Sequence, residues 1–374
     1  MFIKITRNLI KNFIYLFFIS LVSLSGLAIL EFSTRAFNYI NNYDTEDDWF
    51  ETKPKAFRNE ANYSEIKKSL DGTCKYPALQ HRKGTTTHIA DFSCGGITYI
   101  KDKRLTLPIL KEWNKTIHIF GGSTVMGVGS DDAFTIPSII QREFANDQLR
   151  VLNYGVSSFI VKQQNEALKA YKGDIKKGDM VIYYDGGNDF WNGVMLDNLG
   201  GNMVGFNRKH KYQLGIFIIR NWLGKNSSFY RLLSDLKHNR KRNPDICNVN
   251  SKTAAQRVSQ SANHLSKQVN EAREISKVLG AEFLHFYQPT LFDIKTSSFY
   301  EKRILSRSPC FLIAKPFKKV FDDIFLNSAV QSIDLSNVLE GKDLFFDYIH
   351  VSSQGNKIIS DFIIKNIKAN NFTK

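Results

Sequence analysis

The chain has 374 residues, of which 43% are hydrophobic and 13% aromatic, and its formal net charge is +15. This length and hydrophobic content allow a large core, which excludes an intrinsically disordered protein. The basic residues are spread along the chain, with a local concentration only in 208–242, and no nucleic-acid motif accompanies them, so we expect no nucleic-acid partner. The charge is compatible with a solvated basic face, and equally with binding of an acidic polysaccharide or of anionic lipid headgroups.

The N-terminal part of the sequence has the features of a membrane anchor. Residues 1–11 carry basic side chains, and an uncharged apolar stretch follows from Asn12 to Leu30. As a helix, this stretch would span the roughly 30 Å of a bilayer core. The positive-inside rule then predicts a cytoplasmic N-terminus, one transmembrane anchor at 12–31 and a periplasmic or extracellular remainder. A cleaved signal peptide is the alternative, with Ser23 and Ser25 as the small residues near a cleavage site.

Export would place the four cysteines in an oxidising compartment. An even number of cysteines there is compatible with two disulfides, and the pairing Cys74–Cys94 with Cys247–Cys310 closes the shortest loops. Free buried thiols are the alternative. No pair has the C-x-x-C spacing of a zinc site, and we expect no metal and no cofactor.

Two segments separate the predicted anchor from the main domain. Residues 32–60 are polar, with mixed charges, and are expected to form a stalk. Residues 61–113 contain alternating apolar positions on both sides of a Cys-Gly-Gly turn, which predicts a hairpin in a small β-containing annex.

The main domain, predicted over 114–374, alternates apolar runs with helical stretches. Strands are predicted at 116–122, 150–155, 179–187, 281–289 and 330–336. Helices are predicted at 135–146, 161–173 and 254–280. This alternation predicts an α/β fold, a three-layer α/β/α sandwich around a mostly parallel five-stranded sheet. Functional residues of such sheets lie at the carboxyl ends of the strands.

An insertion at about 190–250 interrupts this rhythm. It mixes aromatic residues with the basic cluster and follows directly on a predicted strand end. We expect it either to overhang the site, as a lid or recognition surface, or simply to pack on the domain.

Ser123 follows the first predicted strand, which ends in Gly121-Gly122. Glycines permit a tight turn and close approach of the backbone, so the serine would project from the strand end with amide groups beside it. Serine and glycine are also ordinary turn residues, and this segment alone does not distinguish a nucleophile from a turn.

Two other strand ends supply hydrogen-bond donors. Gly155 ends the second strand, and Asn188 follows the third. A carbonyl attacked by serine develops negative charge on its oxygen, which backbone N–H groups and amide side chains stabilise. The N–H groups of Ser123 and Gly155 and the side chain of Asn188 are therefore predicted to form an oxyanion hole.

A general base is found near the C-terminus. Asp347 lies three residues before His350, just ahead of a helix predicted to begin at Ser352 or Ser353. This spacing lets the carboxylate hold one imidazole nitrogen while the other accepts the serine proton.

Together these segments resemble the SGNH hydrolases, also called GDSL-type esterases and lipases. The four residues that give the family its name stand in the family's order, as Ser123 in GGST, Gly155 in NYGVSS, Asn188 in GGND and His350 in DYIH. The resemblance covers about 116–365 and implies a flavodoxin-like sandwich.

The resemblance also implies residue roles. Ser123 would be the nucleophile, His350 the general base and Asp347 its orienting partner, while Ser123, Gly155 and Asn188 would bind the oxyanion. The sequence departs from the family in one place, because Gly122 stands where the usual Gly-Asp-Ser has its aspartate.

Four further polar residues are expected to have structural roles. His118 and His285 lie within predicted strands and should be packed, hydrogen-bonded side chains. Asp131 and Asp132 are expected in a solvated loop before a helix capped near Thr135.

The sequence therefore predicts an exported serine esterase that removes O-acyl groups, acetyl in particular, from an envelope or extracellular polysaccharide. One alternative is an O-acetyltransferase that uses the same site and takes its acyl group from a membrane partner. A lipid esterase acting on the adjacent bilayer and a non-catalytic, glycan-binding scaffold are the others.

Overall fold

The computed structural model describes residues 23, 25–33, 35, 91–195, 251–295, 309–370 and 372, together with five residues between 298 and 305. The chain divides into two units, one of Met1–Glu51 with Val204–Ile246 and one of Thr52–Met203 with Cys247–Lys374. In the first unit, the described residues 25–33 are helical. The elements named below belong to the second unit.

Several predicted segments lie wholly or mostly outside the described residues. They are 1–11, the anchor at 12–31, the stalk at 32–60, the annex as far as residue 90 and the insertion from 196 onward. Within the parts of the chain that are described, no helix combines the length and the apolar character needed to cross a membrane. The anchor and the insertion stay predictions.

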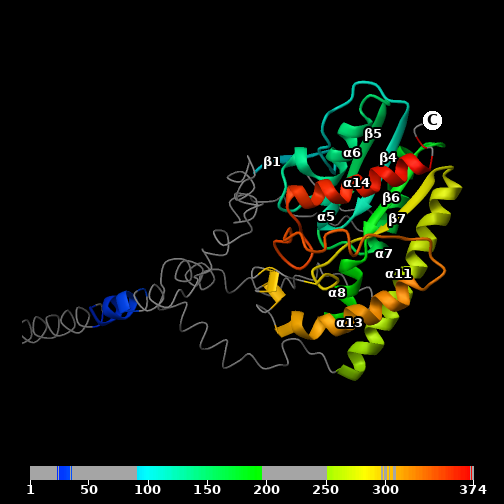
Figure 1. Cartoon of the computed structure of the whole chain (residues 1–374). Coiled ribbons are helices and arrows are strands. Elements are labelled where there is room, and N and C mark those ends of the chain that lie inside the picture. The colour runs from blue at the N-terminus through cyan, green and yellow to red at the C-terminus, as the bar shows by residue number, and fades with distance from the viewer. Residues whose placement is uncertain are drawn as a thin grey trace, which may run out of the picture. The chain divides into compact units, whose positions relative to one another are not determined.

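One mixed sheet forms the centre of the second unit (Figure 1). Its eight described strands are β1 (Phe92–Cys94), β2 (Ile97–Ile100), β3 (Lys103–Arg104), β4 (Lys115–Gly121), β5 (Leu149–Gly155), β6 (Met180–Asp185), β7 (Glu282–Tyr287) and β8 (Ile333–Asp334). They are ordered β1-β2-β3-β5-β4-β6-β7-β8. The strands from β5 to β8 in this order are parallel to one another.

The prediction of a five-stranded sheet is wrong in its strand number. All five predicted strands are present and parallel, but three antiparallel strands extend the same sheet at its β5 edge. The predicted hairpin is found as β1 and β2, and β3 then pairs with β5 through Arg104 opposite Asn153. An edge strand presents unpaired backbone groups, and here the hairpin region provides their partners.

Cys94 lies at the end of β1 and is disulfide-bonded. Cys74 and Cys247 lie outside the described residues, as does the side chain of Cys310. The pairing Cys74–Cys94 with Cys247–Cys310 therefore stays a prediction.

Of the described helices, those at 136–144, 161–170, 251–278 and 353–369 match predicted helices, and the other three were not predicted. In chain order, the described helices are α5 (Ser123–Met126), α6 (Ile136–Phe144), α7 (Val161–Ala170), α8 (Gly187–Met195), α11 (Ser251–Val278), α13 (Pro309–Leu326) and α14 (Ser353–Ala369), with short 3₁₀ turns at Asp132–Phe134 and Lys172–Asp174. Thr135 caps α6 by accepting the Ser138 N–H, and Ser352 caps α14 by accepting the Gly355 N–H, which stops each helix from fraying at its first turn.

Helices cover both faces of the sheet. The connection through α6 runs from β4 outward to β5, and the connection through α7 returns past β4 to β6. Because such crossovers are right-handed, the reversal of direction places α6 and α7 on opposite faces. α14 packs on α6, while α11 packs on α7, α8 and α13 (Figure 1). The parallel strands have the flavodoxin-like order, in which the site lies where the winding direction reverses.

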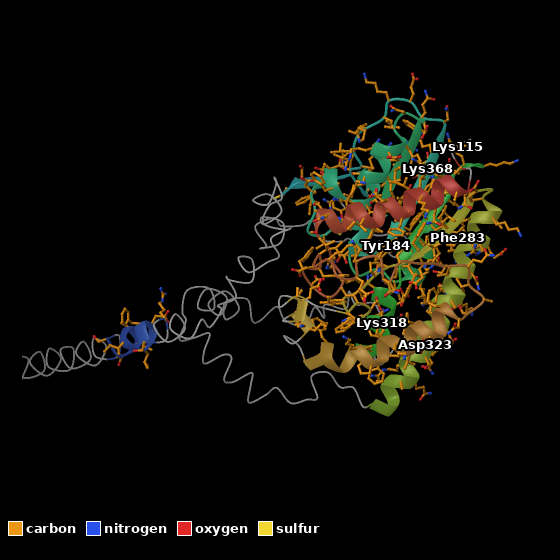
Figure 2. All side chains as sticks on the ribbon, in the orientation of Figure 1. Lys115, Tyr184, Phe283, Lys318, Asp323 and Lys368 are labelled. Atoms are coloured by element: carbon orange, nitrogen blue, oxygen red, sulfur yellow. The ribbon has the colours of Figure 1, made fainter. Side chains whose placement is uncertain are left out.

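The central strands are buried on both faces. Every residue of β6 is buried, as the apolar run at 180–184 predicts for all but the final Asp185. Tyr184 of β6 lies in the middle of the unit, whereas Lys115 and Lys368 lie near its border (Figure 2). This rigid centre carries the strand ends from which the site is built.

Candidate active site

Ser123 is the first residue of α5, directly after β4. Its N-cap residue, Gly122, has no side chain that could cap the helix. The first hydrogen bond of the helix is donated by the Met126 N–H to the Gly122 carbonyl. The N–H groups of Ser123 and Thr124 therefore have no acceptor within the helix. Ser123 is only 6% exposed, so a group bound there would meet these donors with little competing water.

His350 and Asp347 lie beside this serine in one hydrogen-bonded row. The Ser123 Oγ lies 2.7 Å from His350 Nε2, and His350 Nδ1 lies 2.6 Å from Asp347 Oδ2. The other carboxylate oxygen, Asp347 Oδ1, accepts the backbone N–H groups of Ile349 at 2.8 Å and His350 at 2.7 Å. With Nδ1 donating to Asp347, Nε2 of the neutral imidazole is the acceptor for the serine proton.

The carboxyl group of Asp347 is held in its ionised form. Burial opposes ionisation, but the adjacent His350 imidazole and the two backbone N–H donors outweigh it, so the pKa of Asp347 lies below its ordinary value of 3.8. A carboxylate at this position can stabilise the imidazolium that forms when His350 accepts a proton.

The loop that carries His350 is closed upon itself. Phe345 and Val351 form an antiparallel bridge, and the Ser352 N–H donates to the Leu344 carbonyl. The Phe346 ring stacks on the His350 imidazole with centroids 5.6 Å apart. These contacts leave the imidazole little freedom to turn away from Ser123.

Asn188 is the second residue of α8, after β6. Its amide nitrogen donates to the Phe159 carbonyl at 2.9 Å, which leaves the second hydrogen of the amide for another acceptor. A Cβ added to Gly122 would lie 2.5 Å from this nitrogen, so the amide packs against the backbone just before Ser123. The same contact explains Gly122, because the side chain of Asn188 occupies the space that an aspartate would need.

Gly155 ends β5, as predicted, but its N–H group is not free to bind an oxyanion. Its N–H donates to Asn153 Oδ1 at 2.9 Å and is thus already paired. A Cβ at Gly155 would lie 2.0 Å from the Met126 nitrogen, which shows that the strand end packs against the far end of α5. The structure therefore assigns Gly155 to close packing and not to the oxyanion hole.

The turn after β5 offers a different donor, which the sequence did not indicate. Ser158 has a φ of 63°, a left-handed conformation that is uncommon for serine, and the turn is closed by a hydrogen bond from Phe159 to Val156. Within the described ranges the Ser158 N–H has no acceptor. The next residue, Phe159, is the one whose carbonyl Asn188 binds.

An aromatic cluster adjoins the Asp347–His350 loop. Trp191 of α8 stacks on Tyr348 with ring centroids 5.1 Å apart, and Phe292 and Phe311 pack on both. Trp191, Phe311 and Tyr348 are partly exposed. Burial raises the pKa of the Tyr348 phenol, with a smaller contribution from the charge of Asp347, so this ring stays neutral.

The remaining polar residues have structural roles, with one correction. His118 contacts Asp179 and Tyr154, and His285 contacts Asp185 and Ser332, as expected of packed histidines.

The expectation of a solvated loop at 131–132 is wrong. Asp131 and Asp132 are only 6% and 7% exposed. Asp131 caps the 3₁₀ turn, and Asp132 binds the guanidinium of Arg104, a residue that the sequence did not single out. The described residues include no group of three histidine, cysteine or acidic side chains arranged to hold a metal ion.

The sequence of this region matches one known family. Residues 117–363 match the profile of the GDSL-like lipase/acylhydrolase family, which is more than half of the chain. A comparison with curated proteins finds no match.

Several solved structures are similar to this chain over about two thirds of its length, each with a TM-score below 0.5. One is a member of the lipolytic protein G-D-S-L family from Veillonella parvula, with 10% identity, a TM-score of 0.39 and coverage of 67% of this chain and 97% of that one. Another is an acetylxylan esterase from Geobacillus stearothermophilus, with 13% identity, a TM-score of 0.35 and coverage of 68% and 95%. A third is an alpha/beta hydrolase enzyme from the metagenome of Lake Arreo, with 10% identity, a TM-score of 0.37 and coverage of 70% and 98%. Likenesses this distant say nothing about the substrate.

Replacing Gly155 should damage the packing beneath α5. In Gly155→Ala the new Cβ meets backbone atoms that cannot turn aside, and we expect a loss of about 1–3 kcal/mol in the free energy of unfolding. Gly173→Ala is the matched control, because nothing lies within 4 Å of its Cβ position. Urea denaturation of both variants measures the difference; equal midpoints would contradict this account of Gly155.

Proposed function

Because this chain belongs to the family of GDSL-like lipases and acylhydrolases and is therefore an ester-hydrolysing enzyme, we propose that it removes O-acyl groups, acetyl in particular, from a polysaccharide through an acyl-enzyme on Ser123. The observation that carries the proposal is the hydrogen-bonded row from Ser123 through His350 to Asp347. Such a row activates a serine whose ordinary hydroxyl is a weak nucleophile.

The reaction proceeds in two halves. Ser123 Oγ attacks the ester carbonyl while His350 Nε2 takes the hydroxyl proton, and the imidazolium is stabilised by Asp347. Collapse of the tetrahedral intermediate breaks the bond to the sugar oxygen, which receives the proton from His350. Water then attacks the acyl-enzyme with His350 again as base, which releases the carboxylic acid and restores the Ser123 hydroxyl.

The oxyanion of each tetrahedral intermediate needs donors that are already in place. The N–H of Ser123 and the unpaired amide hydrogen of Asn188 supply two, and the Ser158 N–H replaces that of Gly155 as the third. Removing a single donor of this kind typically costs about 10²–10³ in kcat.

A carbohydrate substrate is supported by two features. The partly exposed rings of Trp191 and Tyr348 adjoin Asp347 and would stack on the apolar faces of sugar rings. The net charge of +15 would favour association with an acidic polysaccharide.

The proposal includes an exported location. The predicted anchor at 12–31 would hold the chain with its N-terminus in the cytoplasm, and the catalytic unit would face the periplasm or the exterior. The disulfide at Cys94 supports an oxidising compartment.

Ser123→Ala should abolish ester hydrolysis by the full-length chain. Removing the nucleophile of such a row typically lowers kcat by about 10⁴–10⁶. Ser259→Ala on α11, whose hydroxyl bonds the Ala255 carbonyl of the same helix, is the control and should keep wild-type activity. A chromogenic acetyl ester and acetylated glycans serve as substrates, and equal rates for wild type and Ser123→Ala would remove the proposal.

The products of the same assay separate the alternatives. Acetyl appearing on an added sugar acceptor would show a transferase that depends on a membrane acyl donor. Release of fatty acid from phospholipid vesicles, with no acetate from glycans, would show a lipid esterase. Glycan binding without turnover of any ester would show a scaffold.

The carboxyl group of Asp347 should stay ionised over the neutral pH range. Because its pKa is lowered below 3.8, the carboxylate is lost only as the pH falls below that value, and it is fully present from pH 5 to 9. We expect Asp347→Asn to lower kcat/KM by about 10³–10⁴ at pH 8 to 9. In wild type, the NMR shift of the Asp347 carboxyl carbon should stay that of a carboxylate from pH 5 to 9, and protonation of this group within that range would contradict the lowered pKa.

Trp191→Ala should discriminate against large substrates only. Loss of a stacking ring is worth about 0.5–1.5 kcal/mol, so the KM for an acetylated oligosaccharide should rise about 3- to 10-fold, while kcat/KM for the small acetyl ester changes less than about threefold. Trp113→Ala, which removes an exposed ring that stacks on Arg150, is the control. Equal effects of Trp191→Ala on both substrates would argue against a glycan contact.

A further inference from the structure

Arg104 is a fully buried arginine at the end of β3, with 1% of its surface exposed. Its guanidinium donates to the carbonyls of Met126, Gly127 and Ser130, at 2.7 Å for Gly127 and 2.6 Å for Ser130. All three acceptors lie in or directly after α5, the helix that begins with Ser123. A side chain from the hairpin region thus binds the far end of the nucleophile's helix.

The helix needs such partners because it has a single turn. The last carbonyls of a helix accept no hydrogen bond from within that helix. In a helix as short as α5, nearly all of the carbonyls are of this kind. Asn153 on β5 donates to the Val125 carbonyl at 2.9 Å, and Arg104 binds the two carbonyls that follow. The position of Ser123 therefore depends on side chains outside its own segment.

Asp132 holds the guanidinium from the opposite side. Its Oδ1 accepts Arg104 Nε at 3.0 Å and the Thr98 N–H at 3.1 Å, and its own N–H donates to the Gly96 carbonyl at 2.8 Å. The arginine is consequently fixed between the hairpin and the loop after α5, with its charge compensated in the buried site.

The hairpin also contacts α5 through apolar side chains. Ile97 and Tyr99 of β2 form a buried cluster with Met126, the last residue of α5. Arg104 and this cluster together attach the nucleophile's helix to the hairpin.

The same loop is tied to the element that follows the general base. Asn356, in the first turn of α14, donates to the Ser130 hydroxyl at 2.9 Å and to the Phe134 carbonyl at 3.1 Å. α14 begins three residues after His350. Ser130 thus accepts Arg104 with its carbonyl and Asn356 with its hydroxyl, which links the serine side of the site to the histidine side.

From these contacts we propose that Arg104 is a positioning residue for the nucleophile: it holds α5 so that Ser123 Oγ stays in hydrogen-bonding distance of His350 Nε2. The inference rests on the proposed function of Ser123 as nucleophile. It makes the three antiparallel strands β1, β2 and β3 part of the active site's support, although none of their residues touches the reacting atoms.

Arg104→Lys is the direct test, in the full-length chain. Lysine keeps the charge beside Asp132 but cannot reach three carbonyls with a planar fork, so carbonyls in and after α5 lose their donor. A displacement of about 1 Å at a catalytic group can cost about 10² in rate, and we expect kcat per titrated active site to fall about 30- to 100-fold with KM changed less than about threefold. The rate of covalent labelling of Ser123 by a fluorophosphonate should fall in parallel.

Arg150→Lys is the matched control. Arg150 lies at the start of β5, bonds the Thr116 hydroxyl and covers the Trp113 ring, away from α5. It should lower stability without lowering kcat per active site. Titration of the active sites counts folded enzyme only. A variant that is merely less stable therefore has fewer active sites but keeps its kcat per active site.

Asp132→Asn decides the question if Arg104→Lys does not fold. Asparagine keeps the volume and an oxygen acceptor for Arg104 and Thr98 but loses the charge, so we expect a folded protein with kcat and labelling rate reduced about 3- to 10-fold. Wild-type rates in folded Arg104→Lys, or in Asp132→Asn when the lysine variant does not fold, would overturn the inference. Because labelling does not depend on the natural ester, a wild type that is labelled at Ser123 but hydrolyses no acetylated glycan would overturn the proposed substrate alone. A wild type that is not labelled would overturn both.

Discussion

The close approach of backbone at the carboxyl end of β4 is the constraint on which the site depends. Gly121 is in register with Gly155 on one side and with Tyr184 on the other, and a Cβ there would lie 2.3 Å from Val125 and 2.7 Å from the Tyr184 carbonyl. Only glycine allows the chain to turn at once into α5 in this space. Ser123 therefore leaves the sheet at the point where the winding direction reverses, with its helix pressed against the end of β5.

Charges and hydrogen bonds hold the side chains of the site in place. The carboxylate of Asp347 is kept ionised by an imidazole and two backbone donors, and the imidazole in turn faces a serine that is almost fully buried. Asn153 and Arg104 bind carbonyls at the end of α5, while the first N–H groups of that helix have no acceptor within it. Polar groups fixed before the reaction cost no reorganisation during it, which is how such sites stabilise developing charge.

The parts of this architecture that follow from local pattern could be read from the sequence. The five parallel strands, the helices α6, α7, α11 and α14 and the cap at Thr135 follow from periodicity and capping residues. The proximity of Ser123 and Asn188 also follows, because strand ends of one parallel sheet share an edge. The Asp347–His350 pair lies in the loop between β8 and α14, and its spacing and the family resemblance indicated its role. The role predicted for Gly155 was wrong: its position at a strand end was right, but the direction of a single N–H depends on Asn153 and on the turn after β5.

By itself, then, the sequence determined the order of elements, the parallel character of the central sheet and the residues that meet at its edge, since each depends on contacts close in sequence or on a general rule of βα winding. Tertiary structure alone decided that the hairpin joins the sheet, that Asp132 is buried and that Arg104 supports the nucleophile's helix. Those contacts join residues more than 20 positions apart. They pair buried charges and carbonyls with partners that no local sequence pattern identifies. In the sequence, Arg104 lies in a polar stretch and resembles an exposed basic residue. Only the folded structure shows that its guanidinium binds carbonyls of α5 and of the loop after it.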